Sequence, residues 1–408
     1  MKVLQISIEV NSGSVGKIAE QIGETILENG WESYITYARN HNPSKSEVIK
    51  IGTKIDLYTH ALSTRIFDNH CFSSKSATKK LIDTIKEINP SIIHLHHLHG
   101  YFINIEILFS YLRESGIPIV WTFHDCWSFT GHCAYFDFVG CDKWKTECYS
   151  CEQKTEYPSS LLFDRSTKNF LDKKRIFCSV EDMTIVSVSK WLAGKVNQSF
   201  LKEFDSKVIY NGVDLNCFRP KSSRQMIDNK YAIKDKFLLL GVATTWDKRK
   251  RLEDFIELSL LLNDTFAIIL IGLSNEQIRK LPKNIIGISR TENQEELCDF
   301  YSASDLFLNL SVEETFGLTT AEALACGTPS IVYNATACPE LIDDNTGFVV
   351  EKLNIKELVN KINIASNIGK HHFSKSCRNR AVKLFDKKER FSEYFNLYNE
   401  ILKKNGQK

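Results

Sequence analysis

The stretch that decides the fold runs from Leu306 to Pro329 and reads LFLNLSVEETFGLTTAEALACGTP. It opens with an apolar run as long as a buried strand, and from Thr319 onward its apolar residues recur at helical spacing. Gly327 ends the predicted helix, and the proline that follows prevents it from continuing. A strand, a short loop and a helix in this order predict one unit of a layered α/β protein with a parallel sheet.

Strand and helix signals of the same kind alternate along the rest of the chain. Short apolar runs separated by amphipathic segments are typical of a parallel sheet that is covered by helices on both faces. They predict strands at residues 2–9, 31–37, 91–97, 119–124, 183–189, 237–242, 266–272, 306–310 and 330–333. They predict helices at residues 15–29, 79–88, 252–262, 294–302, 319–326 and 387–404, with another beginning at residue 190.

The chain is long enough for two domains. At 408 residues it exceeds what one hydrophobic core usually supports. The pattern resets at an Asn-Gly turn near residue 211, and the polar residues 221–229 read as an interdomain connection. We therefore predict Rossmann-like domains at residues 1–215 and 216–386. Residues 387–408 are expected to form a helix that packs back on the first domain.

Composition and charge narrow the class of protein. The chain is 43% hydrophobic and 25% charged, and its formal net charge of +2 argues against a dedicated nucleic-acid partner. No apolar run reaches the 18 or so residues that a membrane span requires. The apolar start of the chain is broken by Glu9, so it reads as a first strand and not as a signal peptide. We expect a soluble, cytoplasmic protein.

Two carboxylates flank the start of the predicted helix. Glu314 lies in the loop before it and Glu322 lies in its first turns. The N-terminus of a helix carries free N–H groups and a partial positive charge, which suit a diphosphate. Gly317 has no side chain to obstruct a ligand. In the alternative interpretation, Glu322 only favours the helix dipole and Glu314 is solvated surface.

This stretch resembles the E-x7-E motif of retaining glycosyltransferase family 4, whose members have the GT-B fold. The match runs from Leu306 to Glu351 without a gap. It is supported by Asn211-Gly212-Val213-Asp214, Phe218 and Pro220 at the domain junction and, downstream, by Pro339-Glu340 and the run Asn345-Thr346-Gly347-Phe348-Val349. The resemblance implies two Rossmann-like parallel-sheet domains that face a cleft, with the ligands at the carboxyl ends of the strands.

The resemblance also implies roles for the residues of the motif. Glu314 would accept hydrogen bonds from the transferred sugar, and Glu322 would hold the ribose diol. The amides of Phe316, Gly317 and Leu318 would face the diphosphate of a UDP- or GDP-type donor.

Cations are needed where the nucleoside diphosphate departs. The sequence has no D-x-D triplet to hold a metal-bound nucleotide sugar, so we expect metal-independent catalysis. The basic run at residues 246–251 follows a predicted strand, and Lys250 matches a family lysine. The family arginine has no counterpart at Ala243 or Thr244, and Arg249 is the candidate to replace it. The alternative is a solvated, basic helix start.

The first domain contributes two further candidates. Gly16 lies where the loop after the first strand leads into the first predicted helix. This segment superficially resembles a P-loop, but its glycine spacing differs from that of a P-loop and no Ser or Thr follows Lys17. In the family, this loop contacts donor phosphate or acceptor. His124 ends a predicted strand and matches a family position near the donor sugar.

Four histidines crowd the end of another strand. Strand alternation places His94 and His96 on one face and His97 and His99 on the other. Acceptor contact or packing is favoured there over a metal.

A cysteine cluster lies in a predicted insertion at residues 126–158. Cys133, Cys141, Cys148 and Cys151 end in a C-x2-C pair, the spacing of one arm of a zinc knuckle, and four thiolates form a closed tetrahedral site. A structural zinc ion would hold such an irregular segment. Plain thiols, or a disulfide such as Cys148–Cys151, remain the alternatives.

These features together predict a retaining hexosyltransferase that moves a sugar from a nucleotide diphosphate donor to a glycan or lipid-linked glycan acceptor. Family resemblance places it in surface polysaccharide synthesis, with peripheral contact to the inner membrane face through the first domain. The alternatives are a GT-B epimerase or phosphorylase, and an inactive, zinc-stabilised binding module.

Overall fold

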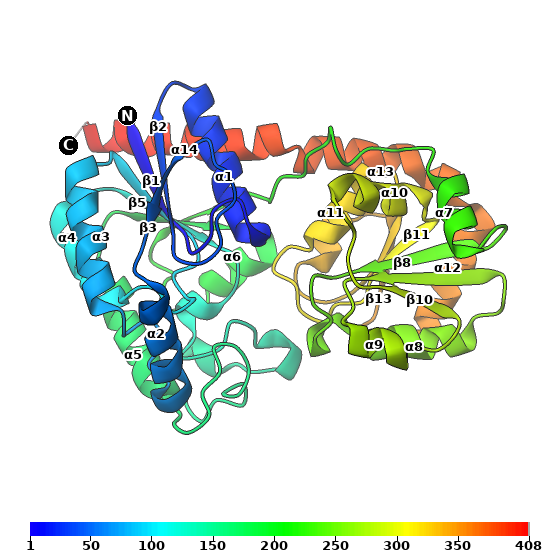
Figure 1. The fold of residues 1–408 in the computed structure, drawn as a ribbon, viewed down its shortest axis with the longest axis horizontal. Coiled ribbons are helices and arrows are strands. Elements are labelled where there is room, and N and C mark those ends of the chain that lie inside the picture. Colours follow the sequence, from blue (N-terminus) through cyan, green and yellow to red (C-terminus); the bar gives the residue numbers. More distant parts are fainter. Residues whose placement is uncertain (407–408) are drawn as a thin grey trace. The chain divides into compact units, whose positions relative to one another are not determined.

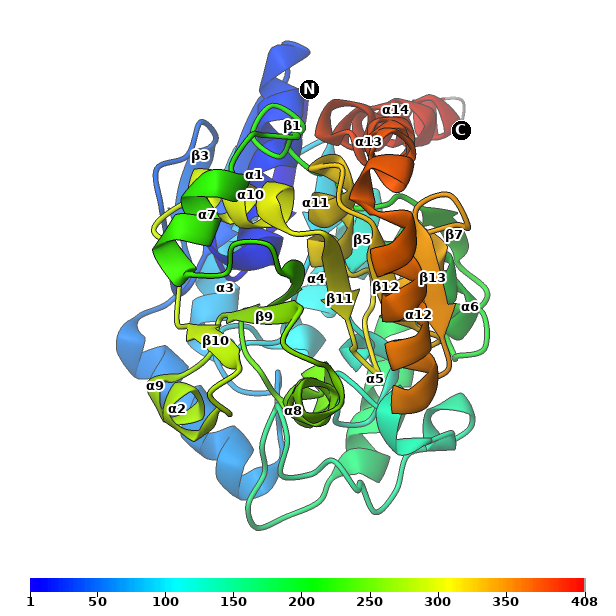
Figure 2. The ribbon, with the colours of Figure 1, turned by 90° about the vertical axis from the view of Figure 1, so that its right-hand side faces the viewer.

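The computed structural model describes residues 1–406 and divides them into two compact units (Figure 1). The first unit comprises Met1–Ile209 together with the C-terminal helix from Lys388, and the second comprises Tyr210–Lys387. The sequence placed these boundaries after residues 215 and 386. Each unit is a parallel sheet with helices on both faces (Figure 1 and Figure 2).

The first unit is built on a seven-stranded sheet in the order β3-β2-β1-β4-β5-β6-β7, and every neighbouring pair is parallel. Its central strands are buried along their whole length because helices cover both faces of the sheet. The strands are β1 (Lys2–Ile6), β2 (Glu32–Tyr37), β3 (Glu47–Lys50), β4 (Ile92–Leu95), β5 (Ile119–Phe123), β6 (Met183–Ser187) and β7 (Asp205–Val208).

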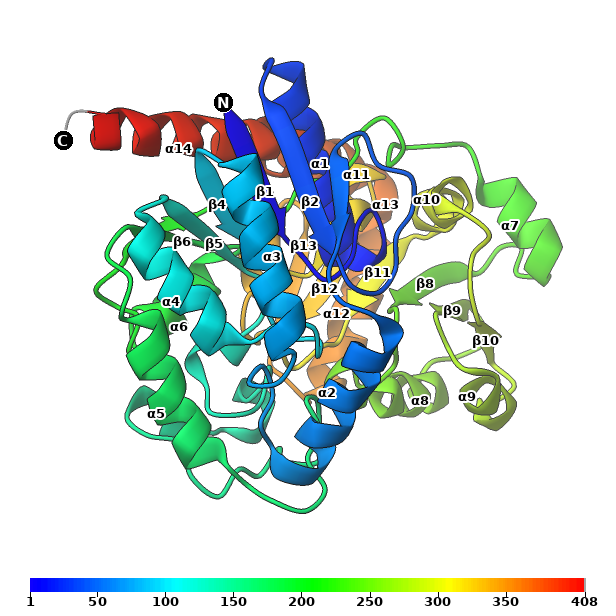
Figure 3. The same ribbon diagram turned by 60° about the vertical axis from the view of Figure 1, so that its left-hand side comes forward.

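Helices α3, α4 and α5 pack side by side against this sheet (Figure 3). Sequence reasoning placed α1 and α3 and the start of α6, and it missed α2, α4 and α5. The helices of the unit are α1 (Gly13–Glu28), α2 (Lys54–Phe67), α3 (Lys75–Ile88), α4 (Ile105–Ser115), α5 (Ser166–Phe177) and α6 (Lys190–Val196).

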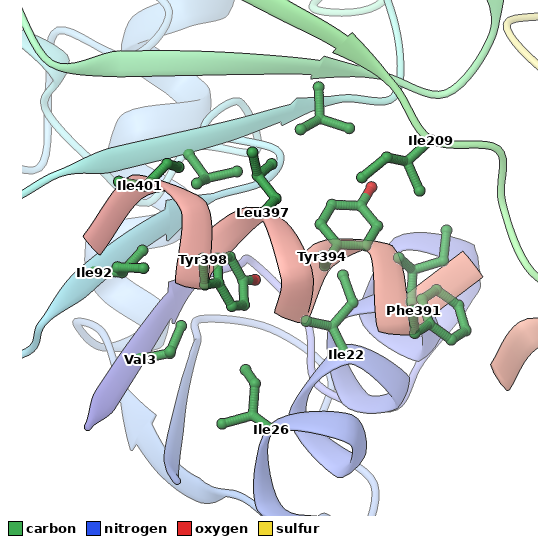
Figure 4. Close-up of a cluster of buried hydrophobic side chains, with 13 residues drawn as sticks. Val3, Ile22, Ile26, Ile92, Ile209, Phe391, Tyr394, Leu397, Tyr398 and Ile401 are labelled. Atoms are coloured by element: carbon green, nitrogen blue, oxygen red, sulfur yellow. The ribbon is translucent and has the colours of Figure 1, made fainter. Parts of the chain in front are cut away.

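The last helix, α14 (Lys387–Gly406), completes the core of the first unit (Figure 4). Its buried face packs with α1 and with strand residues such as Val3 and Ile92. Tyr398 also reaches His94, with 2.7 Å between the hydroxyl and Nδ1. An apolar helix face placed against a sheet in this way accounts for the predicted return of the C-terminal segment to the first domain. The face consists of Phe391, Tyr394, Leu397, Tyr398 and Ile401.

The second unit has a six-stranded parallel sheet in the order β10-β9-β8-β11-β12-β13. Numbered from β8, this is the strand order 3-2-1-4-5-6 of Rossmann folds. The strands are β8 (Phe237–Val242), β9 (Phe266–Ile271), β10 (Ile285–Ile288), β11 (Leu306–Asn309), β12 (Ser330–Tyr333) and β13 (Gly347–Val350).

Two groups of helices cover this second sheet. Helices α8 and α12 contact each other, and α11 contacts both α10 and α13 (Figure 2). The helices of the unit are α7 (Arg224–Tyr231), α8 (Leu252–Leu261), α9 (Asn275–Lys280), α10 (Gln294–Ala303), α11 (Leu318–Ala325), α12 (Ile355–Ile368) and α13 (Lys370–Phe385).

The interpretation of residues 221–229 as an interdomain connection was wrong, because most of them belong to α7. This helix has one buried apolar residue, Ile227, and therefore shows little helical periodicity. Ion pairs hold it instead. Arg224 contacts Asp228 one turn away at 2.8 Å and Asp305 before β11 at 2.6 Å.

The predicted insertion is irregular. Between Phe123 and Ser166 the chain forms no strand or α-helix, only the 3-10 turns η1 (Trp127–Phe129), η2 (Asp137–Val139) and η3 (Lys143–Lys145). Aromatic rings supply its interior: Trp144 lies 5.3 Å from Phe129 and 4.8 Å from Phe136, measured between ring centroids.

Candidate functional site

The site residues predicted in the second unit meet where its strand order reverses. The chain runs from β8 to β9 and β10 on one side and returns to β11, β12 and β13 on the other. Ligands of such sheets bind outside the carboxyl ends of the strands at this reversal. Lys250 follows β8 and Glu314 follows β11. A backbone hydrogen bond from Val312 N to Arg249 O, at 2.9 Å, joins the two loops.

Lys250 and Glu314 form an ion pair through Nζ and Oε1. Ser311 donates a second hydrogen bond to the same carboxylate oxygen at 3.2 Å. The backbone of Glu314 is fixed as well, since its N–H donates to Thr336 Oγ1 and its carbonyl accepts from that hydroxyl, both at 2.8 Å. The two charged side chains are 20% and 16% exposed, so a ligand can reach the pair while its geometry is held.

The basic turn η4 (Lys248–Lys250) is shaped by the carboxylate of Asp247. One oxygen of Asp247 accepts a hydrogen bond from Arg249 N at 2.9 Å, and the other pairs with the Arg249 guanidinium at 2.6 Å. Arg249 is thus brought into the same loop as Lys250, but its charge is shared with Asp247. Sequence reasoning did not foresee this partner.

The start of α11 requires Gly317 and is anchored by Phe316. Gly317 has a φ of 95°, and a Cβ at this position would come within 2.9 Å of the Leu341 side chain. Phe316 is buried, with its ring 5.8 Å from that of Tyr210. Leu318 is the first residue of the helix. The amides of these three residues therefore lie at the helix N-terminus, as the sequence predicts.

Glu322 lies one turn into α11 and is partly exposed. The hydroxyl of the buried Tyr301 donates to its Oε2 at 3.0 Å. Burial and the neighbouring carboxylate raise the pKa of Tyr301 well above its usual value, so it stays a donor. Tyr301 comes from α10, and no spacing in the sequence signals this contact between packed helices.

Gly16, predicted to face a ligand in the first unit, has a packing role in the structure. A Cβ at this position would lie 3.0 Å from the carbonyl oxygen of Glu9. The Gly16 carbonyl accepts a hydrogen bond from Asn11 N at 3.0 Å. The missing side chain therefore lets the loop after β1 close on α1.

His124 follows β5 and belongs to a buried polar chain. Its Nε2 lies 3.2 Å from His96 Nδ1, and His96 Nε2 lies 3.0 Å from Gln5 Oε1. Burial lowers the pKa of both histidines well below the usual value, which keeps them neutral. A neutral imidazole at the end of β5 can exchange a hydrogen bond with a sugar hydroxyl.

The other histidines alternate as predicted. The rings of His94 and His96 lie 4.1 Å apart, and those of His97 and His99 lie 4.3 Å apart. His97 and His99 both approach Asp125, at 3.3 Å and 2.7 Å from the carboxylate. The potential metal-ligand atoms of His97, His99 and Asp125 all lie within 4.8 Å of one another.

All of the cysteines are free thiols in the structure, including those of the predicted insertion. Cys133 and Cys148 are buried, and Cys141 and Cys151 are partly exposed. The four thiols lie near enough to one another to interact, with Cys133 donating a hydrogen bond to Cys151.

Two family models match the chain. The model described as Glycosyltransferase Family 4 matches residues 15–216, and the model described as Glycosyl transferases group 1 matches residues 223–383. WcaC of Escherichia coli (strain K12), named provisionally as a colanic acid biosynthesis glycosyl transferase, is 22% identical over 418 residues, which cover 98% of this chain and 100% of WcaC.

Two further comparisons concern nucleotide sugars. The UDP-Gal:alpha-D-GlcNAc-diphosphoundecaprenol alpha-1,3-galactosyltransferase of Escherichia coli is 23% identical over 224 residues, or 51% of this chain and 57% of that protein. The structure of Anabaena Alr3699/HepE in complex with UDP-glucose superposes with a TM-score of 0.68 at 16% identity, covering 98% and 100% of the two chains.

The sheets and their switch point define the class: the chain has the GT-B fold, with two Rossmann-like units. It is a glycosyltransferase, as the two family models and the full-length relative agree. Among residues 1–406, every helix is too short or too polar to cross a lipid bilayer.

Proposed function

We propose that this glycosyltransferase is a retaining enzyme of family 4 that moves a hexosyl group from a nucleotide diphosphate sugar to a glycan or lipid-linked glycan in surface polysaccharide synthesis. The observation that carries the proposal is the Lys250–Glu314 ion pair beside the N-terminus of α11. Sugar hydroxyls need an anionic acceptor, and a departing diphosphate needs cations and N–H donors. These groups occur together at the switch point of the second sheet.

The donor is held by groups from three elements. In this proposal Glu314 accepts hydrogen bonds from the sugar, and Glu322, oriented by Tyr301, accepts them from the ribose diol. The diphosphate lies at the N-terminus of α11, where the helix dipole favours it. A UDP sugar is the proposed donor, since Alr3699/HepE binds UDP-glucose and the galactosyltransferase relative is named for UDP-Gal.

Lys250 and the helix amides stabilise the leaving group without a catalytic metal. When the donor binds, the ammonium group exchanges part of its contact with Glu314 for a phosphate oxygen, and Arg249 adds a second positive charge nearby. The leaving phosphate then takes the proton of the acceptor hydroxyl on the face from which it departs. The anomeric configuration is retained, and no protein nucleophile is required.

Donor binding tests the site directly. Titration calorimetry with a panel of UDP and GDP sugars should give one preferred donor, and Glu322→Ala should abolish its binding. Glu276→Ala, which removes an exposed carboxylate from α9 in the same unit, is the matched control. Unchanged donor affinity in Glu322→Ala would sink the assignment.

Product analysis tests the reaction. Radiolabelled donor should be transferred to acceptor or slowly hydrolysed, and NMR of the product should show the donor's anomeric configuration. An inverted anomer contradicts the retaining mechanism. Release of epimerised donor, or chain cleavage that depends on phosphate, would instead indicate the epimerase or the phosphorylase.

An apolar surface on the first unit supports peripheral membrane contact. Apolar residues on the outside of α2 continue into the loop after the insertion, where Leu161 N donates to Arg65 O at 2.8 Å and the Phe67 and Phe163 rings stack 6.0 Å apart. Large exposed apolar patches mark protein or membrane contacts, and exposed Lys54 and Arg65 suit anionic lipid. This α2 apolar surface consists of Ile55, Tyr58, Leu62, Phe67, Leu161, Leu162 and Phe163.

Vesicle binding tests the membrane part separately from the chemistry. The full chain should co-sediment with vesicles that contain phosphatidylglycerol, and Leu62→Glu with Leu162→Glu should leave it in the supernatant while donor hydrolysis is unchanged. Leu260→Glu, at a leucine of α8 that is at least as exposed, is the control and should behave like the parent chain. Failure of the parent chain to bind vesicles would refute peripheral contact and leave the transferase assignment standing.

A further inference from the structure

The glycosyltransferase reaction gives no role to the cysteine cluster of the first unit. Its members lie between the 3-10 turns of the insertion and after the last of them, and the chain between them contains neither strand nor α-helix. The buried rings around η1 and η3 supply an apolar interior, but main-chain hydrogen bonds of regular structure do not hold it together. A segment of this kind needs another source of order if it is to stay folded.

The thiols gather as one group of four, not as two separate pairs. Cys133 interacts with Cys151, Cys148 and Cys141, and Cys148 interacts with Cys141 and Cys151 as well. Each of the two buried thiols therefore lies near the other three. Two disulfides would instead divide the set into pairs, and all four are free in the structure.

Backbone N–H groups donate to two of the four sulfur atoms. Gly131 N donates to Cys148 Sγ at 3.2 Å, and the backbone N–H of Gln153 donates to Cys151. Hydrogen bonds to a charged group stabilise its charged form. A Cβ at Gly131 would lie 2.7 Å from Cys148 Cβ, so the backbone reaches the sulfur only because this residue is glycine.

Two lysine side chains lie near the cluster. Lys173, buried in α5, interacts with Cys133 and Cys148, and Lys143 of η3 interacts with Cys141. Four thiolates around a divalent cation carry a net charge of −2. Nearby ammonium groups offset that charge and reduce the cost of burying it.

We propose that Cys133, Cys141, Cys148 and Cys151 bind one Zn²⁺ ion in a tetrahedral site that holds the insertion in its folded form. Zinc with four cysteines is a closed, structural arrangement that leaves no position for substrate. Binding releases the thiol protons to solvent. Among the described residues, the ligand atoms of His97, His99 and Asp125 lie within 4.8 Å of one another and those of the cysteine cluster do not, so zinc binding requires the four sulfur atoms to draw closer.

Metal analysis of the full chain tests the proposal. Protein purified under reducing conditions should contain about one zinc per chain, and a mercurial that modifies thiols should release it. Cys151→Ser should contain far less zinc, while Cys178→Ser, at an exposed cysteine at the end of α5, should retain it. Zinc content that is the same in both variants would overturn the assignment, as would protein without stoichiometric metal.

A second measurement covers the case in which Cys151→Ser fails to fold. The unsubstituted chain, freed of metal by a chelator and then given Co²⁺, should show the visible absorption of tetrahedral cobalt bound by thiolates. Hydrogen exchange of residues 126–158 should slow when zinc is restored. Absence of both changes, or a thiol titration that finds these cysteines joined as disulfides, would refute the site.

Discussion

The two sheets share one topology but end in different chemistry. In the second unit the strands on either side of the switch point lead to charged, partly exposed groups, Lys250 and Glu314. In the first unit, β4 and β5 lead to buried histidines such as His96 and His124, whose charge is suppressed. A similar backbone therefore presents partly exposed charges in one unit, whereas in the other unit His96 and His124 are neutral and the Asp125 carboxylate is buried against other histidines.

Solvation explains the contrast. Lys250 keeps contact with water and has a carboxylate beside it, so its position carries no large desolvation cost. The chain Gln5–His96–His124 is buried and contains no carboxylate, so charging either ring would be unfavourable. Charged groups suit a diphosphate, and neutral groups suit the hydroxyls of a sugar.

The largest effect should come from removing the cation of the second unit. Lys250→Ala should lower kcat by about 10²- to 10³-fold, the usual effect of deleting one donor to a developing anion. Acceptor KM should change little, because the lost contact is to the departing phosphate. Steady-state kinetics with the preferred donor measure both. Lys248→Ala, at an exposed neighbour in the same turn, is the control.

The buried histidines should make the first unit sensitive to acid. Burial lowers the pKa of His94 and of His97 to about 3. Below pH 6.5 these histidines are protonated in the unfolded chain but stay unprotonated in the folded chain, so the free energy of unfolding falls as the pH drops. Each should cost about 2 kcal/mol of stability at pH 5 relative to pH 7. His132 opposes the trend, because the Asp68 carboxylate raises its pKa in spite of burial.

Hydrogen exchange of the full chain at pH 7 and pH 5 checks this expectation unit by unit. The histidines of the second unit, His371 and His372, are both exposed, so its core amides should exchange from openings of similar free energy at the two pH values. Equal loss of protection in both units would contradict the assigned cause. Denaturant unfolding of the whole chain gives the total change.

Most of the fold followed from apolar periodicity. Strands such as Phe237–Val242 and Ser330–Tyr333 were predicted with the bounds that the structure has, because both are buried on both faces. Edge strands were missed: β3 and β7 have no fully buried residue, so their sequences look like loops. Helix α7 was missed for a related reason, since ion pairs hold it more than apolar contacts do.

The candidate site could be predicted only for residues that lie together in one segment of the sequence. The arrangement of the loop and helix from Glu314 to Glu322 could be predicted, because these residues form one contiguous segment in which a glycine marks the start of the helix. The partners of these residues lie elsewhere in the chain, as Tyr301 and Thr336 show. Their roles depend on helix packing and loop closure, which residue spacing in the sequence does not predict.

Removing the Tyr301 hydroxyl tests whether this residue orients Glu322 in the second unit. Tyr301→Phe keeps the ring but deletes the hydrogen bond to Glu322, so the carboxylate loses its orientation. Donor affinity should fall about tenfold, equivalent to about 1.4 kcal/mol, which is close to the lower end of the range for a hydrogen bond to a charged group. Calorimetric titration measures this loss, and an unchanged Kd would show that Glu322 does not depend on Tyr301.

The smallest effect is expected where the first unit uses a histidine only for structure. Tyr398→Phe removes the hydroxyl that contacts His94 at 2.7 Å and leaves the buried ring of α14 in place. The free energy of unfolding should fall by about 1 kcal/mol, while kcat and donor Kd stay unchanged. Tyr394→Phe, whose hydroxyl makes a longer contact of 3.3 Å with Thr122, should cost less. Denaturant melts of the two variants rank them, and the reverse order would mean that His94 satisfies its hydrogen bonds without α14.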